Sequence, residues 1–266
     1  MSRTRPAAVA GLFYPADASQ LHRDIRSMLE SVEVTEKAPK ALIVPHAGYI
    51  FSGPVAASAF AQLKNNSARI QRVILLGPCH RVPLRGLATS SADFFETPLG
   101  RVKIDHEAIK LIASLPQVRE FDLTHEQEHS LEVQLPFLQE IVPDFSLVPL
   151  VVGDTDAEEV SEVLETLWGG DETLIVISSD LSHYHDYNTA RAMDSETCVA
   201  IEELNPAAIH YDQACGRNPV TGLLLAAKKH GLDVTTLDLR NSGDTSGDKS
   251  SVVGYGAWAF SQAAPR

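Results

Sequence analysis

Short apolar runs of strand length alternate along the chain with longer segments whose apolar residues recur at helical spacing. The first helical segment spans residues 18–30, and Asp17 is a suitable N-cap because its carboxylate can accept from free amides of the first turn. Apolar runs without polar interruption are typical of strands buried on both faces of a sheet. Those runs occupy residues 41–45, 72–76, 147–153 and 173–178. One further helical segment, rich in Ala, follows Pro54 and ends at about residue 63, and two more span about 156–168 and 219–230.

The alternation of buried strands with amphipathic helices predicts βαβ units. We therefore expect an α/β fold whose central sheet is largely parallel or mixed and is flanked by helices. Residues 233–240 and 251–260 are two further strand candidates, joined by a loop rich in Gly, Ser and Asp. The 266 residues show no internal repeat, low-complexity tract or linker, so a single domain over residues 1–266 is expected.

The chain is acidic, with 22 Lys and Arg against 35 Asp and Glu and a formal net charge of −13. A chain of this charge without a basic cluster repels phosphate backbones and anionic lipid surfaces, so neither nucleic acid nor a membrane is an expected partner. No apolar run approaches the length of a membrane span or a signal peptide. Three cysteines without CxxC spacing suit a reducing compartment, and a cytoplasmic location is expected.

Residues that carry chemistry follow three of the buried strands directly. His46 comes after the run at 41–45, His80 after the next run, and Asp180 and His183 after the run at 173–178. Ligands of open α/β sheets bind beyond the carboxyl ends of the strands, so these side chains are expected to converge on one pocket. A single histidine after a strand is more often an ordinary loop residue, but three such loops on one sheet edge favour a functional pocket.

Imidazole and carboxylate groups together indicate a divalent metal site. Neutral imidazole suits Fe, Zn, Cu and Ni, and two histidines with one carboxylate form the ligand set of non-haem Fe(II) oxygenases. The sequence contains neither HExxH nor a cysteine-rich zinc spacing, so a standard zinc protease or structural zinc site is not indicated. The alternative is a metal-free pocket in which histidines act as acid and base.

A second polar cluster, HEQEHSLEVQLP, spans residues 125–136. If a helix starts at about Ser130, His129 and Glu132 are neighbours on one helix face and both reach the pocket. The alternative is a solvated helix start whose acidic residues are stabilised by the helix dipole. Spacing alone does not separate the two interpretations.

Two Gly-containing segments offer further candidates. Residues 241–250 have the composition of a turn, although an aspartate between glycines can also carry a carboxylate into a site. In CGRNP, Pro219 marks the start of a predicted helix. Arg217 beside that helix start is a candidate clamp for an anionic group. Cys215 is a candidate nucleophile, although no adjacent base is visible in the sequence.

Six motifs follow one another along the chain: VPHAGYIFSG (44–53), LGPCHR (76–81), EHSLEVQLPFL (128–138), SSDLSHY (178–184), CGRNP (215–219) and SGDTSGDKSSVVGY (242–255). In this order they resemble the Memo family, whose microbial branch is labelled AmmeMemoRadiSam system protein B. The opening RPAAVAGLFYP is also similar to the family's N-terminus, so the resemblance covers essentially the whole chain.

The resemblance implies a fold like that of class III extradiol dioxygenases of the LigB type, in which two histidines and a carboxylate hold Fe(II). It implies that His46 and His80 are the paired imidazole ligands. Counting back from SVVGY, Asp244 stands where the animal branch has a cysteine, and we expect it to be the third ligand. Such a ligand set favours Fe(II), with Cu or Zn as alternatives.

The resemblance also implies roles for the remaining candidates. His183, together with Asp180, would take the acid/base position, and His129 and Glu132 would line the same pocket. One functional hypothesis is a metal-dependent redox enzyme that acts on a small hydroxylated or aromatic substrate. The other is a non-catalytic protein that binds a metal, an anion or a peptide, with Arg217 as the recognition residue. Its partners would be a radical-SAM protein and an AMMECR-type protein.

Overall fold

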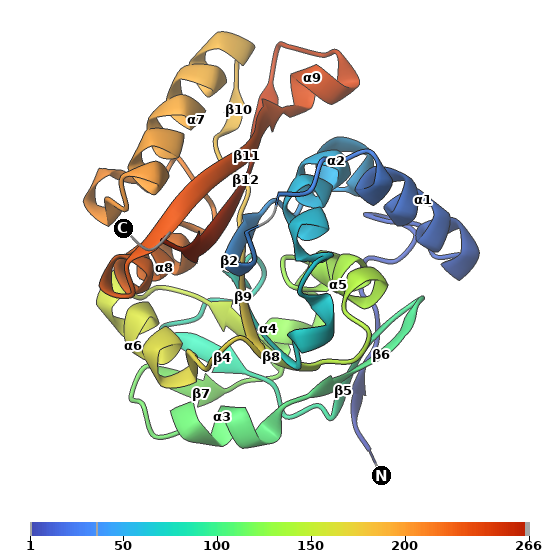
Figure 1. The fold of residues 1–266 in the computed structure, drawn as a ribbon, viewed down its shortest axis with the longest axis vertical. Helices are drawn as coiled ribbons and strands as arrows, with labels where there is room; N and C mark the ends of the chain where they lie inside the picture. The colour runs from blue at the N-terminus through green and yellow to red at the C-terminus, as the bar shows by residue number, and fades with distance from the viewer. Residues whose placement is uncertain (1, 36, 264–266) are drawn as a thin grey trace.

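The computed structural model describes residues 2–35 and 37–263, which form a large mixed sheet with helices packed on both faces (Figure 1). The predicted α/β fold with a mixed central sheet flanked by helices is therefore confirmed. The strands are β1 (Thr4–Arg5), β2 (Pro39–Val44), β3 (Arg72–Pro78), β4 (Leu87–Thr89), β5 (Phe94–Thr97), β6 (Gly100–Ile104), β7 (Val118–Glu120), β8 (Ser146–Val152), β9 (Thr173–Ser178), β10 (His183–His185), β11 (Leu232–Asn241) and β12 (Val252–Gln262).

The centre of the sheet is parallel. Its strand order is β1-β5-β6-β8-β3-β9-β2-β12-β10, with β11 paired to β12, and with β4 paired to β7 and β8. The four strands β8, β3, β9 and β2 run in the same direction, and β12 runs antiparallel beside β2. The carboxyl ends of β2, β3 and β9 therefore meet at one edge, which is where the sequence places its histidine-bearing loops.

Two helical layers cover the sheet. The helices α1, α2 and α5 pack on one face, and α3, α6, α7 and α8 pack on the other (Figure 1). Along β2, Leu42 and Val44 face the first layer while Ala41 and Ile43 face the second, which explains why this strand is apolar throughout. The helices are α1 (Ala18–Glu30), α2 (Tyr49–Phe60), α3 (His106–Ile112), α4 (Leu123–Glu126), α5 (Leu135–Ile141), α6 (Ala157–Leu167), α7 (Tyr187–Glu202), α8 (Arg217–Lys229) and α9 (Ser242–Ser246).

Three local predictions need correction. No regular helix starts at Ser130: residues 132–134 form one 3-10 turn before α5 begins at Leu135. The helix expected from Pro219 begins two residues earlier, at Arg217. The loop at 241–250 contains the short helix α9, whose N-cap Asn241 and third residue Asp244 form a capping box. Among the described residues, no helix is both long and apolar enough to cross a membrane.

A buried ion pair fixes the N-terminal segment to the loop that precedes α5. Arg5 Nη1 lies 2.6 Å from Glu132 Oε2, and both side chains are almost fully buried. Glu132 also accepts from the backbone N–H groups of Ala8 and Val9 and from the hydroxyl of Tyr14. Every acceptor site of this carboxylate is therefore used within the protein, which is the condition for burying a charge.

The short helix α4, just before this loop, contains a buried neutral histidine. His125 is 2% exposed, and its Nε2 lies 3.1 Å from the carbonyl oxygen of Ala88. Because a carbonyl only accepts, Nε2 carries the proton, and Nδ1 has no hydrogen-bond partner among the residues that the structure describes. Burial lowers the pKa of His125 to about 4, against an ordinary value of 6.5.

We expect His125 to make the folded protein less stable in mild acid. The unfolded chain takes up a proton at His125 below pH 6.5 while the folded chain does so only near pH 4, so stability present above pH 6.5 is lost as the pH falls. Between pH 7 and 5 this histidine should cost about 2 kcal/mol of unfolding free energy. Urea unfolding of the wild type and of His125→Gln across this range measures the difference. Parallel pH profiles for the two proteins would contradict the assignment.

Candidate metal centre

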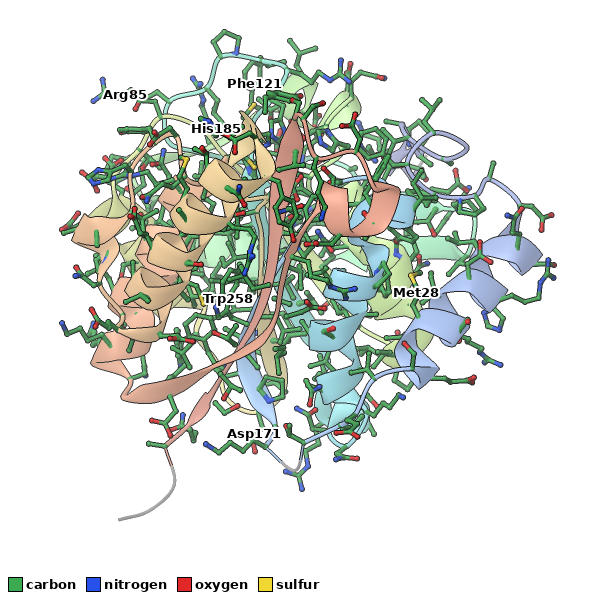
Figure 2. The ribbon with its side chains drawn as sticks, turned by 90° about the horizontal axis from the view of Figure 1, so that it is seen from above. Met28, Arg85, Phe121, Asp171, His185 and Trp258 are labelled. Carbon is green, nitrogen blue, oxygen red and sulfur yellow. The ribbon has the colours of Figure 1, made fainter. Side chains whose placement is uncertain are left out.

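The loops after β2 and β3 and the start of α8 meet beyond the carboxyl edge of the sheet. Figure 2 shows His185 at this edge and Asp171, just before β9, at the opposite one. Ligand-type atoms of His46, His80 and Cys215 lie within 4.8 Å of one another. His46 Nε2 is 3.3 Å from Cys215 Sγ. Nitrogen and sulfur ligands of one tetrahedral metal are roughly 3.3–3.6 Å apart, so this group has the dimensions of a metal site.

His46 is held in one orientation and one tautomer. It follows β2 after Pro45, and its backbone N–H donates to Asp180 Oδ1 at 2.7 Å. Its Nδ1 lies 2.9 Å from Ser178 Oγ, which donates its own proton to the carbonyl of Ser130. Since that hydroxyl must accept from the imidazole, Nδ1 carries the proton and the lone pair of Nε2 faces Cys215. Complete burial, together with repulsion from neighbouring histidines, lowers the pKa of His46 well below its usual value.

His80 is oriented by a buried carboxylate that the sequence did not single out. Glu128 accepts from the backbone N–H of His80 at 2.7 Å and lies 2.9 Å from its Nδ1. It also accepts from the backbone N–H groups of His129 and Ser130. Burial alone would raise the pKa of Glu128, but the hydrogen bonds and charge of His80 outweigh it and lower the pKa to about 2. An ionised Glu128 accepts from Nδ1–H of His80. The lone pair of the other ring nitrogen, Nε2, is then available to bind a metal.

Replacing Glu128 should therefore weaken metal binding without removing a ligand. We expect Glu128→Gln to lower metal affinity by about 10- to 100-fold, because the amide no longer fixes the His80 ring as a carboxylate does. Competition with a chromophoric chelator measures the change. Glu126→Gln is the matched control, since Glu126 is exposed and two residues away. An unchanged affinity in Glu128→Gln would show that His80 needs no such support.

His129 completes a group of three imidazoles. Its ring centroid lies 4.7 Å from that of His80 and 5.4 Å from that of His46. Burial lowers the pKa of His129 to about 4, despite the opposing charge of Glu128. On its other side the ring of Phe13 lies 4.7 Å away. His129 therefore lies beside the candidate metal ligands, in an irregular segment between α4 and α5.

A close approach between two backbones brings Cys215 to the histidines. Its backbone N–H donates to the carbonyl of Asp180, and burial followed by the charge of Asp180 raises the pKa of its thiol. A Cβ atom at Gly216 would lie 2.6 Å from the Cβ of Ser179 and 2.8 Å from the carbonyl oxygen of Ser178. Only glycine therefore allows the segment before α8 to pack this tightly against the end of β9.

Asp180 supports His46 rather than His183. It is buried, and its Oδ2 lies 4.0 Å from His46 Nε2 while Oδ1 accepts from the His46 backbone. Burial raises the pKa of Asp180 to about 7. Asp180 was expected to act together with His183, but its carboxylate is directed at the loop after β2.

His183 lies at a bulge in β10, where the pairing of β10 with β12 is irregular. His183 and His185 pair with the consecutive residues Val253 and Val252, so Tyr184 is the extra residue of the bulge. Tyr184 has a φ of 61° and is 78% exposed. A positive charge on His183 would contribute to the lowered pKa of His46, after burial and the charges of His80 and His129. Burial lowers the pKa of His183 itself.

Three predicted site residues are engaged elsewhere. Asp244 accepts from the hydroxyl of Tyr187 at 2.7 Å and from the backbone of Asn241, and it lines a separate small cavity with Arg191. It is not part of the group formed by the two histidines and Cys215. Glu132 is enclosed by its buried ion pair. The side chain of Arg217 donates to the carbonyl of Ile209 and packs over the ring of Tyr211 at 4.3 Å.

The sequence did not indicate the contributions of Glu128 and Ser178, and it suggested Cys215 as a nucleophile rather than as a metal ligand. Glu128 lies one residue from His129 in a cluster that suggested a helix, and spacing did not show that it turns back towards His80. Ser178 is the last residue of β9, and a serine at the end of a strand does not by itself indicate a hydrogen bond to a histidine. Cys215 lies 169 residues from His46, so only the tertiary structure joins them.

Together, the fold and this site define an α/β protein with an imidazole- and thiol-lined pocket at the carboxyl edge of its sheet. Residues 5–259 match the family model described as Memo-like protein. The chain is 39% identical to a MEMO1 family protein of Ignicoccus hospitalis over 96% of this chain and 98% of that protein. It is 38% identical to one of Aquifex aeolicus, over 95% and 97%. The chain therefore belongs to the Memo-like family.

A solved structure shows a similar fold. The crystal structure of an uncharacterized protein from Escherichia coli K12 is similar with a TM-score of 0.51 at 14% sequence identity. The similarity covers 82% of this chain and 98% of that one. At this identity the likeness concerns the fold alone.

Proposed function

We propose that this protein is a metal-dependent redox enzyme that acts on a small hydroxylated or aromatic substrate. The observation that carries the proposal is the convergence of His46, His80 and Cys215, whose ligand-type atoms lie within 4.8 Å of one another. Both imidazoles donate Nδ1–H to fixed acceptors, which leaves two Nε2 lone pairs for a metal. Three protein ligands leave further coordination positions for a substrate, which is typical of catalytic sites.

Fe(II) is the metal we propose, with Cu and Zn as competitors because a thiolate in the ligand set suits softer ions. When bound, the metal would supply redox chemistry to a small molecule that enters its open position. The chain's own residues would do the rest. Ser178 and Glu128 hold the ligand rings in place, Asp180 fixes the His46 loop, and His183 is the proposed proton carrier beside the site.

The test starts with protein purified anaerobically, whose bound metal is measured by mass spectrometry. After loading with Fe(II), O2 uptake is followed with catechol and substituted catechols. We expect about one iron per chain and substrate-dependent O2 uptake, with His183→Gln keeping the iron and losing the uptake. Failure of the wild type to bind Fe(II), Cu or Zn would overturn the proposal.

The second function considered was recognition of an anion or a peptide through Arg217. The guanidinium of Arg217 is already engaged by Ile209, Asn218 and the ring of Tyr211, so its contacts with the described residues do not favour an anion clamp. Association with a radical-SAM protein and an AMMECR-type protein stays a prediction. Co-purification from cells that contain all three proteins tests it.

A further inference from the structure

A groove of about 510 Å³ lies between the N-terminal segment, α1 and the start of α2, and its lining includes Phe13, whose ring lies 4.7 Å from that of His129. Figure 2 shows Met28, one of its lining residues, between α1 and α2. The rings of Phe13 and Phe51 form part of its wall. The groove is larger than the other cavities described for this chain and is distinct from the metal ligands, none of which lines it.

Two large apolar side chains stand exposed on its rim. Leu12 and Ile50 line the groove and are each 80% exposed to solvent. They come from different segments of the chain, one before α1 and one in the first turn of α2. Together with Phe13, Met28 and Phe51 they give the groove a largely apolar lining, which is typical of sites for small molecules.

Backbone hydrogen bonds join the segments that line the groove. The carbonyl of Phe13 accepts from the backbone N–H of Tyr49 at 2.8 Å, which ties the N-terminal turn to α2. Within that turn, Gly11 has a φ of 81°, and its N–H donates to the carbonyl of Tyr14. Tyr14 is in turn fixed by its hydrogen bond to Glu132. A preformed groove binds without the cost of ordering its own loops.

The groove shares a wall with the candidate metal centre. The ring of Phe13 lines the groove and lies 4.7 Å from the ring of His129. Gly48, two residues after His46, lines it as well. A Cβ atom at Gly48 would lie 3.6 Å from the carbonyl oxygen of Phe13. A molecule in the groove would therefore lie next to the imidazoles, with one aromatic ring between them.

The charge of the groove selects among ligands. Asp24 on α1 is the charged side chain among the described lining residues, and no Lys, Arg or His lines the groove with it. Within the described part of the chain, Asp24 forms no ion pair. A carboxylate at the edge of an apolar surface attracts an ammonium group and repels an anion.

We propose that this groove is a recognition subsite for the apolar body of an ammonium-bearing small molecule. The assignment rests on the proposed function, because it makes the groove the place where the substrate of the neighbouring metal centre is selected. It names the substrate class as an apolar or aromatic amine and excludes an organic anion.

The test uses the full-length protein without added metal, so that it is independent of the metal centre. Butylammonium, hexylammonium and hexanoate are titrated and binding is followed by amide chemical shifts in NMR spectra. Affinity should rise about fourfold for each added methylene, since burying one methylene contributes about 0.8 kcal/mol to the binding free energy. Hexylammonium should bind about fivefold more tightly than hexanoate, which is the upper end of the effect of one solvent-exposed charge pair.

Two variants locate the binding. Ile50→Ser should weaken the dependence on chain length, and Asp24→Asn should remove the preference for ammonium over carboxylate. Leu111→Ser is the control, because Leu111 is 59% exposed on α3, on the other face of the sheet. Affinity that does not depend on chain length, or that ignores both variants, would overturn the subsite. Such a result would leave metal binding by the histidines intact, so the two proposals fail separately.

Discussion

The double variant His46→Ala/His80→Ala is expected to lose metal binding altogether. Metal binding free energies of about 10–16 kcal/mol are shared among three or four donors, so the loss of two donors should lower affinity by more than about 10³-fold. Metal content after desalting, measured by mass spectrometry, is the readout. The fold should survive, since His80 lies in a loop at the sheet edge and the alanines add no bulk.

The matched control for this prediction is His22→Ala/His106→Ala. Both of these histidines lie on surface helices, with side chains 43% and 41% exposed. The control substitutions remove the same number of imidazoles and lie outside the candidate metal site. Full metal stoichiometry in the His46→Ala/His80→Ala variant would contradict the assignment of both ligands.

The second large effect concerns stability. Glu132→Ala should lower the free energy of unfolding by about 3–5 kcal/mol, because it leaves the Arg5 guanidinium buried without its counter-charge. It also removes the acceptor used by the Tyr14 hydroxyl and by two backbone N–H groups. Thermal unfolding should therefore begin on the order of 10 °C lower.

Glu126→Ala is the control for Glu132→Ala, because Glu126 is exposed and its loss should change stability by less than about 0.5 kcal/mol. This experiment also decides between two interpretations of Glu132. Unchanged stability combined with weaker substrate or metal binding would restore Glu132 as a pocket residue, as the sequence suggested. Strong destabilisation supports its structural role beneath the loop that carries Glu128 and His129.

The fold could be predicted because buried strands and amphipathic helices have different patterns of apolar residues along the chain. Strands buried on both faces are continuously apolar, and β2, β3, β8 and β9 all lie within two residues of the predicted runs. The short strands β4, β5 and β7 were not predicted, since segments of three or four residues carry too little periodicity. The turn at 132–134 was mistaken for a longer helix because the polar residues of a capped loop and of a helix start look alike.

The candidate site was predictable only in part. The topology rule brings the loops after β2, β3 and β9 to one edge, so the neighbourhood of His46 and His80 followed from the strands alone. The third member of the group did not follow. Asp244 has the favoured carboxylate chemistry, but its capping box and Tyr187 hold it elsewhere. Cys215 reaches the site through the close packing of Gly216 on β9, which depends on atomic contacts rather than on spacing.

We propose that His46, His80 and Cys215, rather than Asp244, hold the metal. The most direct test is a titration of Fe(II) under anaerobic conditions into the wild type, Cys215→Ala and Asp244→Ala. We expect the wild type and Asp244→Ala to bind about one Fe(II) per chain with similar affinity, and Cys215→Ala to bind at least about tenfold more weakly. Normal binding by Cys215→Ala together with loss of binding in Asp244→Ala would contradict this account.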